Sequence, residues 1–434
     1  MFAVANAPLF TRHGPLLSLY GRQMAKGDCK FSRLPDITIT KPQRCKMQLV
    51  DEVVSTKDEV AEWRRTLHAD PELLFDVHNT AAFVADKLKS FGCDEVVTGI
   101  GRTGVVGIIH GRPGGNGPAI GLRADMDALP INEITGAPWA SRTPGKMHAC
   151  GHDGHTAMLL GAARHLAATR NFTGSVAVIF QPAEEGGGGG REMVNDGMMD
   201  RFGITKVFGM HNLPGLPVGE FAICKGPIMA ATDIFDLTIK GRGGHAAMPH
   251  QTIDPIVAAS AIVTALQSIA SRNANPLESL VVSVTKFIAG SAYNIIPETV
   301  EMAGTVRTLS AEMRDMAETR IGEIVRNVAA AHGAEATFNY IRNYPVTFNH
   351  SDETDFAADI AESVAGTGKV ERKQPPTMGG EDFSFMLEAR PGAFIFMGNG
   401  DTASLHHPAY DFNDDAIPVG VSYWVRLAEK ALAA

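Results

Sequence analysis

Residues that can bind a divalent metal gather in the segment MHACGHDGH, at positions 147–155. Cys150 and His152 are separated by one residue and stand directly before a predicted helix. Thiolate and imidazole are the usual ligands of zinc and similar cations, and two such groups in a tight turn can face the same point. The segment therefore predicts a metal site, with Asp153 and His155 expected to cap the helix and support the ligands. The alternative is a purely packing and capping role.

The segment QPAEEGGGGG, at positions 181–190, offers two adjacent carboxylates. In a turn, Glu184 and Glu185 can point in different directions, so that one binds a metal while the other accepts a proton from water. The spacing of the glycines fits neither a P-loop nor a dinucleotide fingerprint. We expect them to let the backbone pass close to a crowded site. An exposed acidic turn is the alternative interpretation.

Two further histidines follow predicted strands, His211 in GMHN and His406 in SLHHPAYDF. A lone histidine is more often a surface or packed residue than a ligand, and only the number of candidates changes that expectation. Together the candidates offer more ligands than one tetrahedral site needs, and about the number that two adjacent metals need. The candidate ligands are Cys150, His152, Glu185, His211 and His406.

These candidates follow short apolar strands that alternate with helices. The strand-like segments are 104–110, 119–125, 176–181 and 206–212, and the segment 155–168 is helical. Continuous rather than alternating apolar strands are typical of a mostly parallel sheet with both faces covered. In such α/β sheets, ligands bind at the carboxyl ends of the strands. The sequence therefore predicts that this edge of the sheet carries the site.

The pattern changes near Lys225, where Phe235, Leu237 and Ile239 begin an alternating, half-buried strand. Predicted helices at 254–271 and 311–332 and three more strands complete a β-α-β-β-α-β order, which is the ferredoxin-like unit. We therefore predict an inserted domain. Its expected range is 225–340, within a catalytic domain made of 47–224 and 341–434.

The composition is that of an ordinary globular protein of 434 residues, with 44% hydrophobic and 20% charged residues. A formal net charge of −9 disfavours binding to nucleic acid or to an anionic membrane. The longest charge-free apolar stretch, 255–271, is shorter than a membrane span requires. Five scattered cysteines do not form a disulfide framework and suit a reducing compartment, so we predict a cytoplasmic location.

The first 46 residues stand apart, with eight Lys or Arg and only two acidic residues. This bias is similar to that of an organelle transit peptide, but prolines interrupt it and no amphipathic periodicity persists. We expect an over-extended start or a disordered tail, because Met47 opens a segment that reads as a natural beginning.

Seven motifs that carry these residues occur in order along the chain: GLRADMDALPINE (121–133), MHACGHDGHTAMLLGAA (147–163), QPAEEGGGG (181–189), GMHN (209–212), GRGGHAAMPH (241–250), MGGEDFSFM (378–386) and LHHPAYDFND (405–414). From about Met47 to the C-terminus the chain closely resembles the M20 metallopeptidase clan, in its amidohydrolase branch. That branch contains hippurate hydrolases, N-acyl-amino-acid amidohydrolases and indole-acetyl-amino-acid hydrolases. The resemblance implies a metallo-aminopeptidase-like catalytic domain with an inserted ferredoxin-like domain.

The resemblance implies two divalent metal ions per subunit, of Zn, Mn, Co or Ni, held by Cys150, His152, Glu185, His211 and His406. It also implies that Glu184 is the general base. Elsewhere in the clan a His-x-Asp motif supplies a ligand, where this chain has Asp125-Met126-Asp127. Cys150 would then take over that coordination, and Asp125 or Asp127 would support the ligands without binding the metal.

In the family the inserted domain is a dimerisation and lid module. The resemblance implies that His245 reaches the partner subunit's site and stabilises the oxyanion of the reaction, so we expect a homodimer, with a tetramer left open. It also implies that Asn294 and Arg307 hold the carboxylate of the substrate. For Arg307, an ordinary surface charge at the end of a strand is the alternative.

The implied reaction is hydrolysis of the amide bond of a small N-acyl-amino acid by a metal-activated water, with hippurate (N-benzoylglycine) as the first expected substrate. N-acetyl-amino acids, indole-acetyl-amino acids and dipeptides are the alternatives. Two hypotheses of other classes are a thiol hydrolase with Cys150 as nucleophile and a non-catalytic binding protein on the same scaffold. The second would lack a base or a ligand, and the sequence has the complete set. Neither nucleic acid nor a membrane is an expected partner.

Overall fold

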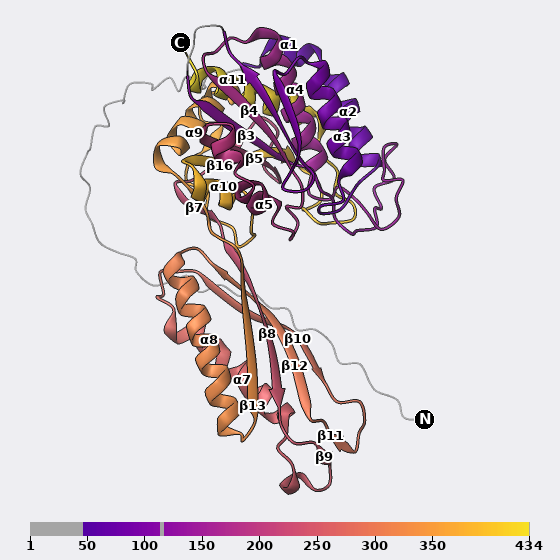
Figure 1. Ribbon diagram of the computed structural model, residues 1–434, viewed down its shortest axis with the longest axis vertical. Helices are drawn as coiled ribbons and strands as arrows, with labels where there is room; N and C mark the ends of the chain where they lie inside the picture. Colours follow the sequence, from indigo (N-terminus) through magenta and orange to yellow (C-terminus); the bar gives the residue numbers. More distant parts are fainter. Residues whose placement is uncertain (1–46, 113–116, 434) are drawn as a thin grey trace, which may run out of the picture. The chain divides into compact units, whose positions relative to one another are not determined.

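The computed structural model describes residues 47–112 and 117–433 (Figure 1). The expectation for residues 1–46 lies outside this range. The described chain contains two main sheets, and each is packed against its own set of helices.

The larger sheet has eight strands in the order β1-β2-β4-β3-β5-β16-β6-β15. Its strands are β1 (Glu95–Ile100), β2 (Gly104–His110), β3 (Ala119–Asp125), β4 (Ser175–Gln181), β5 (Ile204–Pro214), β6 (Phe221–Ala222), β15 (Val370–Glu371) and β16 (Gly392–Gly400). The central strands β4, β3, β5 and β16 are parallel to one another, whereas β2 is antiparallel to both of its neighbours. The predicted mostly parallel sheet is confirmed at its centre.

Helices cover both faces of this sheet, which explains why its strands are apolar throughout. Along β4, Val176, Val178 and Phe180 belong to one hydrophobic cluster, while Ala177 and Ile179 belong to another on the opposite face. The first cluster is built with α1 (Asp51–Ser55), α2 (Lys57–Ala69), α3 (His78–Ser90), α4 (His152–Thr169), α9 (Ser351–Ala365) and α11 (Ile417–Ala431). The second is built with α5 (Gly189–Asn195), α6 (Met198–Arg201) and α10 (Ser384–Ala389).

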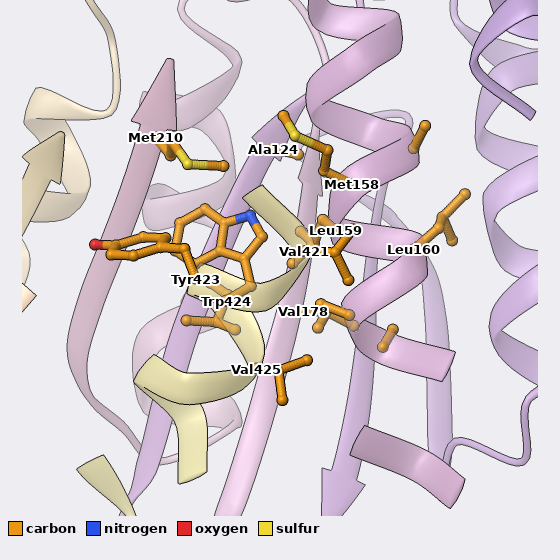
Figure 2. Packing of buried hydrophobic residues seen from close by; sticks show 14 of the residues in the cluster. Ala124, Met158, Leu159, Leu160, Val178, Met210, Val421, Tyr423, Trp424 and Val425 are labelled. Carbon is orange, nitrogen blue, oxygen red and sulfur yellow. The ribbon is translucent and has the colours of Figure 1, made fainter. Parts of the chain in front are cut away.

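The packing of α4 and α11 against the sheet fixes the start of α4, where two candidate ligands lie. Figure 2 shows Met158 and Leu159 of α4 beside Val421 and Trp424 of α11. All four side chains are at most 1% exposed. Because close-packed interiors tolerate little displacement, the first turn of α4 is held rigidly against the carboxyl ends of the strands.

The smaller sheet has four antiparallel strands in the order β10-β12-β8-β13. These are β8 (Ala231–Lys240), β10 (Leu280–Ala289), β12 (Thr299–Thr308) and β13 (Glu335–Tyr344), with the helices α7 (Pro255–Ser268) and α8 (Ala311–Ala331) between them in sequence. This order confirms the predicted ferredoxin-like unit. The inward residues of β8 and one face of each helix form a separate core. The domain boundaries near 225 and 340 stay a prediction.

Helix α7 begins where Asp254 accepts a hydrogen bond from the Ile256 N–H, and it continues as a π-helical turn, Ile269–Asn273. By length and composition the segment Pro255–Asn273 could cross a membrane, so the expectation that this stretch is too short for a span is wrong. Within this fold it lies on the smaller sheet, with Ile262 and Leu266 fully buried. One face of the helix therefore packs on the smaller sheet, while only 33% of the segment is buried.

Short elements complete the described structure. β9 (Gly244–His245) pairs with β11 (Ile295–Ile296), and we refer to this pair as the β9–β11 ribbon. β7 (Gly226–Met229) pairs with β14 (Thr347–Asn349). In sequence, β7 directly precedes β8 and β14 directly follows β13. Two 3-10 turns are Pro249–Gln251 and Asp414–Ala416.

Candidate active site

Candidate ligand atoms meet at the carboxyl ends of the central strands. Cys150, His152 and His211 each offer an atom that lies within 4.8 Å of the other two, and Cys150, Glu185 and His406 form a second group under the same limit. The Cys150 Sγ lies 3.4 Å from Nε2 of His211. The structure therefore brings all five predicted ligands into two overlapping groups that share Cys150.

The two buried imidazoles are oriented with one nitrogen free to bind a cation. Nδ1 of His152 lies 2.8 Å from the Asp127 carbonyl oxygen, and Nδ1 of His211 lies 2.7 Å from the Asn212 carbonyl oxygen. A carbonyl oxygen can only accept a hydrogen bond, so each ring donates its Nδ1–H and keeps its lone pair on Nε2. Among the described residues, His152 Nε2 has no hydrogen-bond partner although it is buried. This donor set fits a divalent metal.

His406 approaches from a separate loop and closes the second group. Its Nε2 lies 3.2 Å from Glu185 Oε1, and its backbone N–H donates to the Ala149 carbonyl at 2.8 Å. The residue has a φ of +63°, which is costly for a side chain with a Cβ. Such strain persists only where the surrounding structure holds it, and it concentrates at functional sites.

Asp125 and Asp127 lie behind the ligands, and their carboxylates are already engaged. The Asp127 carboxylate accepts from the backbone N–H groups of Glu184 and Glu185, at 2.9 and 3.1 Å. The Asp125 carboxylate lies 2.7 Å from His155 Nδ1 and accepts a hydrogen bond from an Arg123 N–H at 2.6 Å. Both geometries agree with the expectation that these residues support the ligands.

The loop with Glu184 is crowded, as the glycine run predicts. A Cβ on Gly189 would lie 1.7 Å from the Pro182 carbonyl oxygen, so only glycine fits there. Glu184 itself is 7% exposed and lines the cavity described below. Burial, followed by the charges of Glu381 and Glu185, raises the pKa of Glu184 well above its usual range. A carboxylate with a raised pKa is suited to accepting and returning a proton.

Cys150 does not resemble the nucleophile of a thiol hydrolase. Burial, followed by the charges of Glu185 and Glu184, raises the pKa of the Cys150 thiol well above its usual range. Nucleophilic cysteines instead lie in surroundings that lower the thiol pKa. The site is therefore suited to a thiolate stabilised by a bound cation.

A cavity of about 640 Å³ opens in front of these groups. Its apolar wall is formed by Leu213, Met229, Ile234, Phe396 and Leu405. Half-buried Arg307, on β12, lines the same cavity. The cavity thus combines Glu184 and four of the five candidate ligands, all but His152, with an apolar wall and a guanidinium group.

Two predicted residues do not reach this cavity. His245 and Asn294 are both exposed; His245 ends β9 of the β9–β11 ribbon, and Asn294 directly precedes β11. The Ala246 N–H donates to the Asn294 carbonyl at 3.0 Å. Neither residue lines the cavity within the same chain. Their predicted roles toward the oxyanion and the substrate carboxylate stay predictions.

The expectation that Asp153 and His155 cap α4 is wrong. The N-cap is Gly151, with a φ of +87°, and no side chain caps this helix. Asp153 instead pairs with His68, whose Nδ1 lies 2.8 Å from the carboxylate. His155 joins Asp125 and accepts from the Asn212 N–H at 3.0 Å. Both side chains therefore bind other buried groups and leave the N-terminus of the helix uncapped.

Sequence reasoning missed a buried ionic cluster beneath Glu184. Arg123 is 1% exposed, and its guanidinium donates to Glu381 at 2.9 Å, Asp382 at 3.1 Å and Gln181 at 2.9 Å. A signal was available, because an arginine in the middle of a fully apolar strand must find carboxylate partners.

Comparisons with known proteins agree with this geometry. The family model of peptidases M20/M25/M40 matches residues 121–430. The chain belongs to this family. It is 43% identical to a hippurate hydrolase of Campylobacter jejuni, covering 89% of this chain and 100% of the relative. It is 41% identical to an N-acetylcysteine deacetylase of Bacillus subtilis, covering 84% and 94%.

A solved structure of the Bacillus subtilis YxeP protein, described as a dinuclear metal binding peptidase from the M20 family, is also similar. It has a TM-score of 0.76 and 37% identity, covering 87% of this chain and 99% of that chain. The resemblance to the amidohydrolase branch is confirmed, and the chain is a metal-dependent hydrolase of amide bonds.

Proposed function

We propose that this enzyme hydrolyses the amide bond of N-acyl-amino acids, with hippurate as the first substrate to test. The observation that carries the proposal is the cavity in which Glu184 and four candidate ligands face an apolar wall and Arg307, with His152 grouped directly behind Cys150 and His211. Arg307 is suited to a substrate carboxylate, because a guanidinium binds carboxylates through paired, charge-assisted hydrogen bonds. The apolar wall is suited to an acyl group such as benzoyl.

The residues have separate tasks in this proposal. Cys150, His152, Glu185, His211 and His406 hold two divalent metal ions. When bound, such ions polarise an amide carbonyl and make water more acidic. Glu184 accepts the proton from the attacking water and returns it to the leaving nitrogen. The Asp127 carboxylate holds the backbone of Glu184 and Glu185 in place by accepting hydrogen bonds from their N–H groups.

The proposed active unit is a homodimer in which His245 of one subunit donates a hydrogen bond to the oxyanion in the other. Two observations support it: His245 is exposed, and it does not line its own chain's cavity. The β9–β11 ribbon can therefore serve a neighbouring chain without first leaving a packed position. A cytoplasmic location stays a prediction.

A substrate panel tests the proposal. Hippurate, N-acetyl-amino acids, indole-acetyl-amino acids and dipeptides would be assayed with Zn, Mn, Co and Ni in turn. We expect the highest kcat/KM with an N-acyl-amino acid that has an apolar acyl group. A preference for dipeptides with a free amino group would contradict the proposal, and a preference for acetyl groups would favour the deacetylase alternative.

A further inference from the structure

Tyr344, the last residue of β13, reaches into the loop that carries Glu184. Its hydroxyl donates to the Glu184 carbonyl oxygen at 2.7 Å and accepts from the Gly188 N–H at 3.0 Å. The residue is 4% exposed, so both bonds form in surroundings of low dielectric, where they are stronger than in water. One hydroxyl thus joins the two ends of the 184–188 loop.

A β-bulge directs the Tyr344 side chain to this position. In the pairing of β13 with β8, Arg342 lies opposite Asp233 and Tyr344 lies opposite Thr232, so Asn343 is an extra residue. Side chains alternate between the two faces of a strand, and one extra residue reverses the alternation beyond it. Tyr344 therefore faces away from the side that its spacing from Arg342 would predict.

The loop needs such support because its backbone is strained. Ala183 has a φ of +55°, a left-handed conformation that is unfavourable for alanine. Asp127 holds the backbone N–H groups of Glu184 and Glu185, and Tyr344 holds the Glu184 carbonyl. The peptide units on both sides of the Glu184 side chain are therefore fixed, by Asp127 two residues beyond β3 and by Tyr344 at the end of β13.

We propose that Tyr344 is a positioning residue for the hydrolytic reaction, whose hydroxyl fixes the direction of the Glu184 carboxylate. The inference rests on the proposed role of Glu184 as general base. Tyr344 belongs to the smaller sheet, so the same contact links the inserted unit to the catalytic loop.

Removal of this one hydroxyl, by Tyr344→Phe in the metal-loaded full chain, tests the inference. The ring keeps its edge contact with Phe385, at 6.1 Å between centroids, so the packing is retained. Tyr340→Phe is the matched control, because Tyr340 lies on the same strand as Tyr344 but its hydroxyl donates to Asp233 of β8, at 2.8 Å, and not to the 184–188 loop. Activity, metal content and Tm would be measured for both variants.

We expect Tyr344→Phe to lower kcat about tenfold, with KM and metal content within twofold of the starting enzyme. Tyr340→Phe should leave kcat within twofold, even with a similar fall in Tm. An unchanged kcat in Tyr344→Phe would overturn the inference. A fall in kcat that follows only lost metal or lost folded protein would also overturn it, because it would reveal a purely structural role.

A double-variant cycle separates this inference from the proposed function. If Tyr344 acts through Glu184, then Tyr344→Phe should change kcat by less than twofold in a Glu184→Gln background. The full tenfold fall in that background would show that Tyr344 acts on another group, and would contradict the inference alone. Normal activity of Glu184→Gln by itself would instead contradict the proposed role of Glu184.

Discussion

The strand-end cluster and the β9–β11 ribbon differ in whether a single chain brings their residues to the cavity. The cluster consists of Cys150, His152, Glu184, Glu185, His211 and His406, which come from four separate parts of the sequence and meet in one place. All but His406 are largely buried, and both buried imidazoles are fixed by backbone carbonyls. His245 in the ribbon and Asn294, directly before β11, are instead exposed and lie outside the cavity.

The difference shows which functions require a rigid core. Metal ligands must converge within a few ångströms, and strand ends packed between helices keep such positions with little cost in reorganisation. A hydrogen-bond donor for an oxyanion is needed only once the substrate is bound. Such a residue can therefore come from an exposed ribbon of a second subunit. The following experiments test this division.

The largest effect is expected from loss of metal at the strand-end cluster. Dialysis against EDTA should abolish activity, and adding back Zn, Mn, Co or Ni should restore it. Elemental analysis should find close to two equivalents of metal per subunit, and fewer in Cys150→Ala. Survival of activity after dialysis would point to thiol chemistry, and full metal content in Cys150→Ala would contradict the assignment of this ligand.

Substitutions of the two adjacent glutamates should distinguish the general base from the metal ligand. Glu184→Gln should retain its metal and lose roughly 10²–10⁴-fold in kcat, because only proton transfer is removed. Glu185→Gln should lose metal affinity as well, since its buried Oε1 would no longer be a carboxylate oxygen. Kinetics and metal analysis of the two variants provide the measurement, and opposite phenotypes would mean that the roles are exchanged.

The ribbon should matter only between subunits. His245→Ala should lower kcat by roughly 10²–10³, the usual effect of removing one oxyanion donor. Mixing His245→Ala with Glu184→Gln subunits should restore part of the activity, because one site of each heterodimer then has both residues intact. Heterodimers that form and stay inactive would place His245 in its own chain or outside the reaction.

The smallest effects are expected from the residues assigned to the substrate carboxylate. Arg307→Gln should lower kcat/KM by about 10- to 100-fold, since a hydrogen bond to a charged group contributes about 1.5–3 kcal/mol. Asn294→Ala should lower it by about tenfold or less, because its hydrogen bond is formed by a neutral amide.

Substrates with an α-carboxamide in place of the carboxylate are the control for both variants. The Arg307→Gln effect should disappear with them. Equal losses with acid and amide substrates would mean that Arg307 supports the cavity and does not bind the carboxylate.

The sequence alone determined the element types and the candidate ligands. Apolar periodicity is enough to define helices such as α2 and α3, because Val60 and Trp63 in the first and Val84 and Leu88 in the second recur at helical spacing and are buried. The β-α-β-β-α-β order could be predicted because buried and exposed residues alternate along β8 with the two-residue period of a strand, which a helix does not have. Residue chemistry identified the ligand set, since thiolate, imidazole and carboxylate are the groups that bind such metals.

Tertiary structure alone decided how these residues are held. Asp125 and Asp127 are close in sequence, yet one carboxylate engages Arg123 and His155 while the other binds backbone N–H groups of the Glu184 loop. The role of Tyr344 could not be found from the sequence. A single bulged residue reverses the face of the strand on which its side chain lies, and its partner Glu184 is 160 positions away in the chain. Side-chain direction depends on register and packing between distant segments, and local patterns carry no information about either.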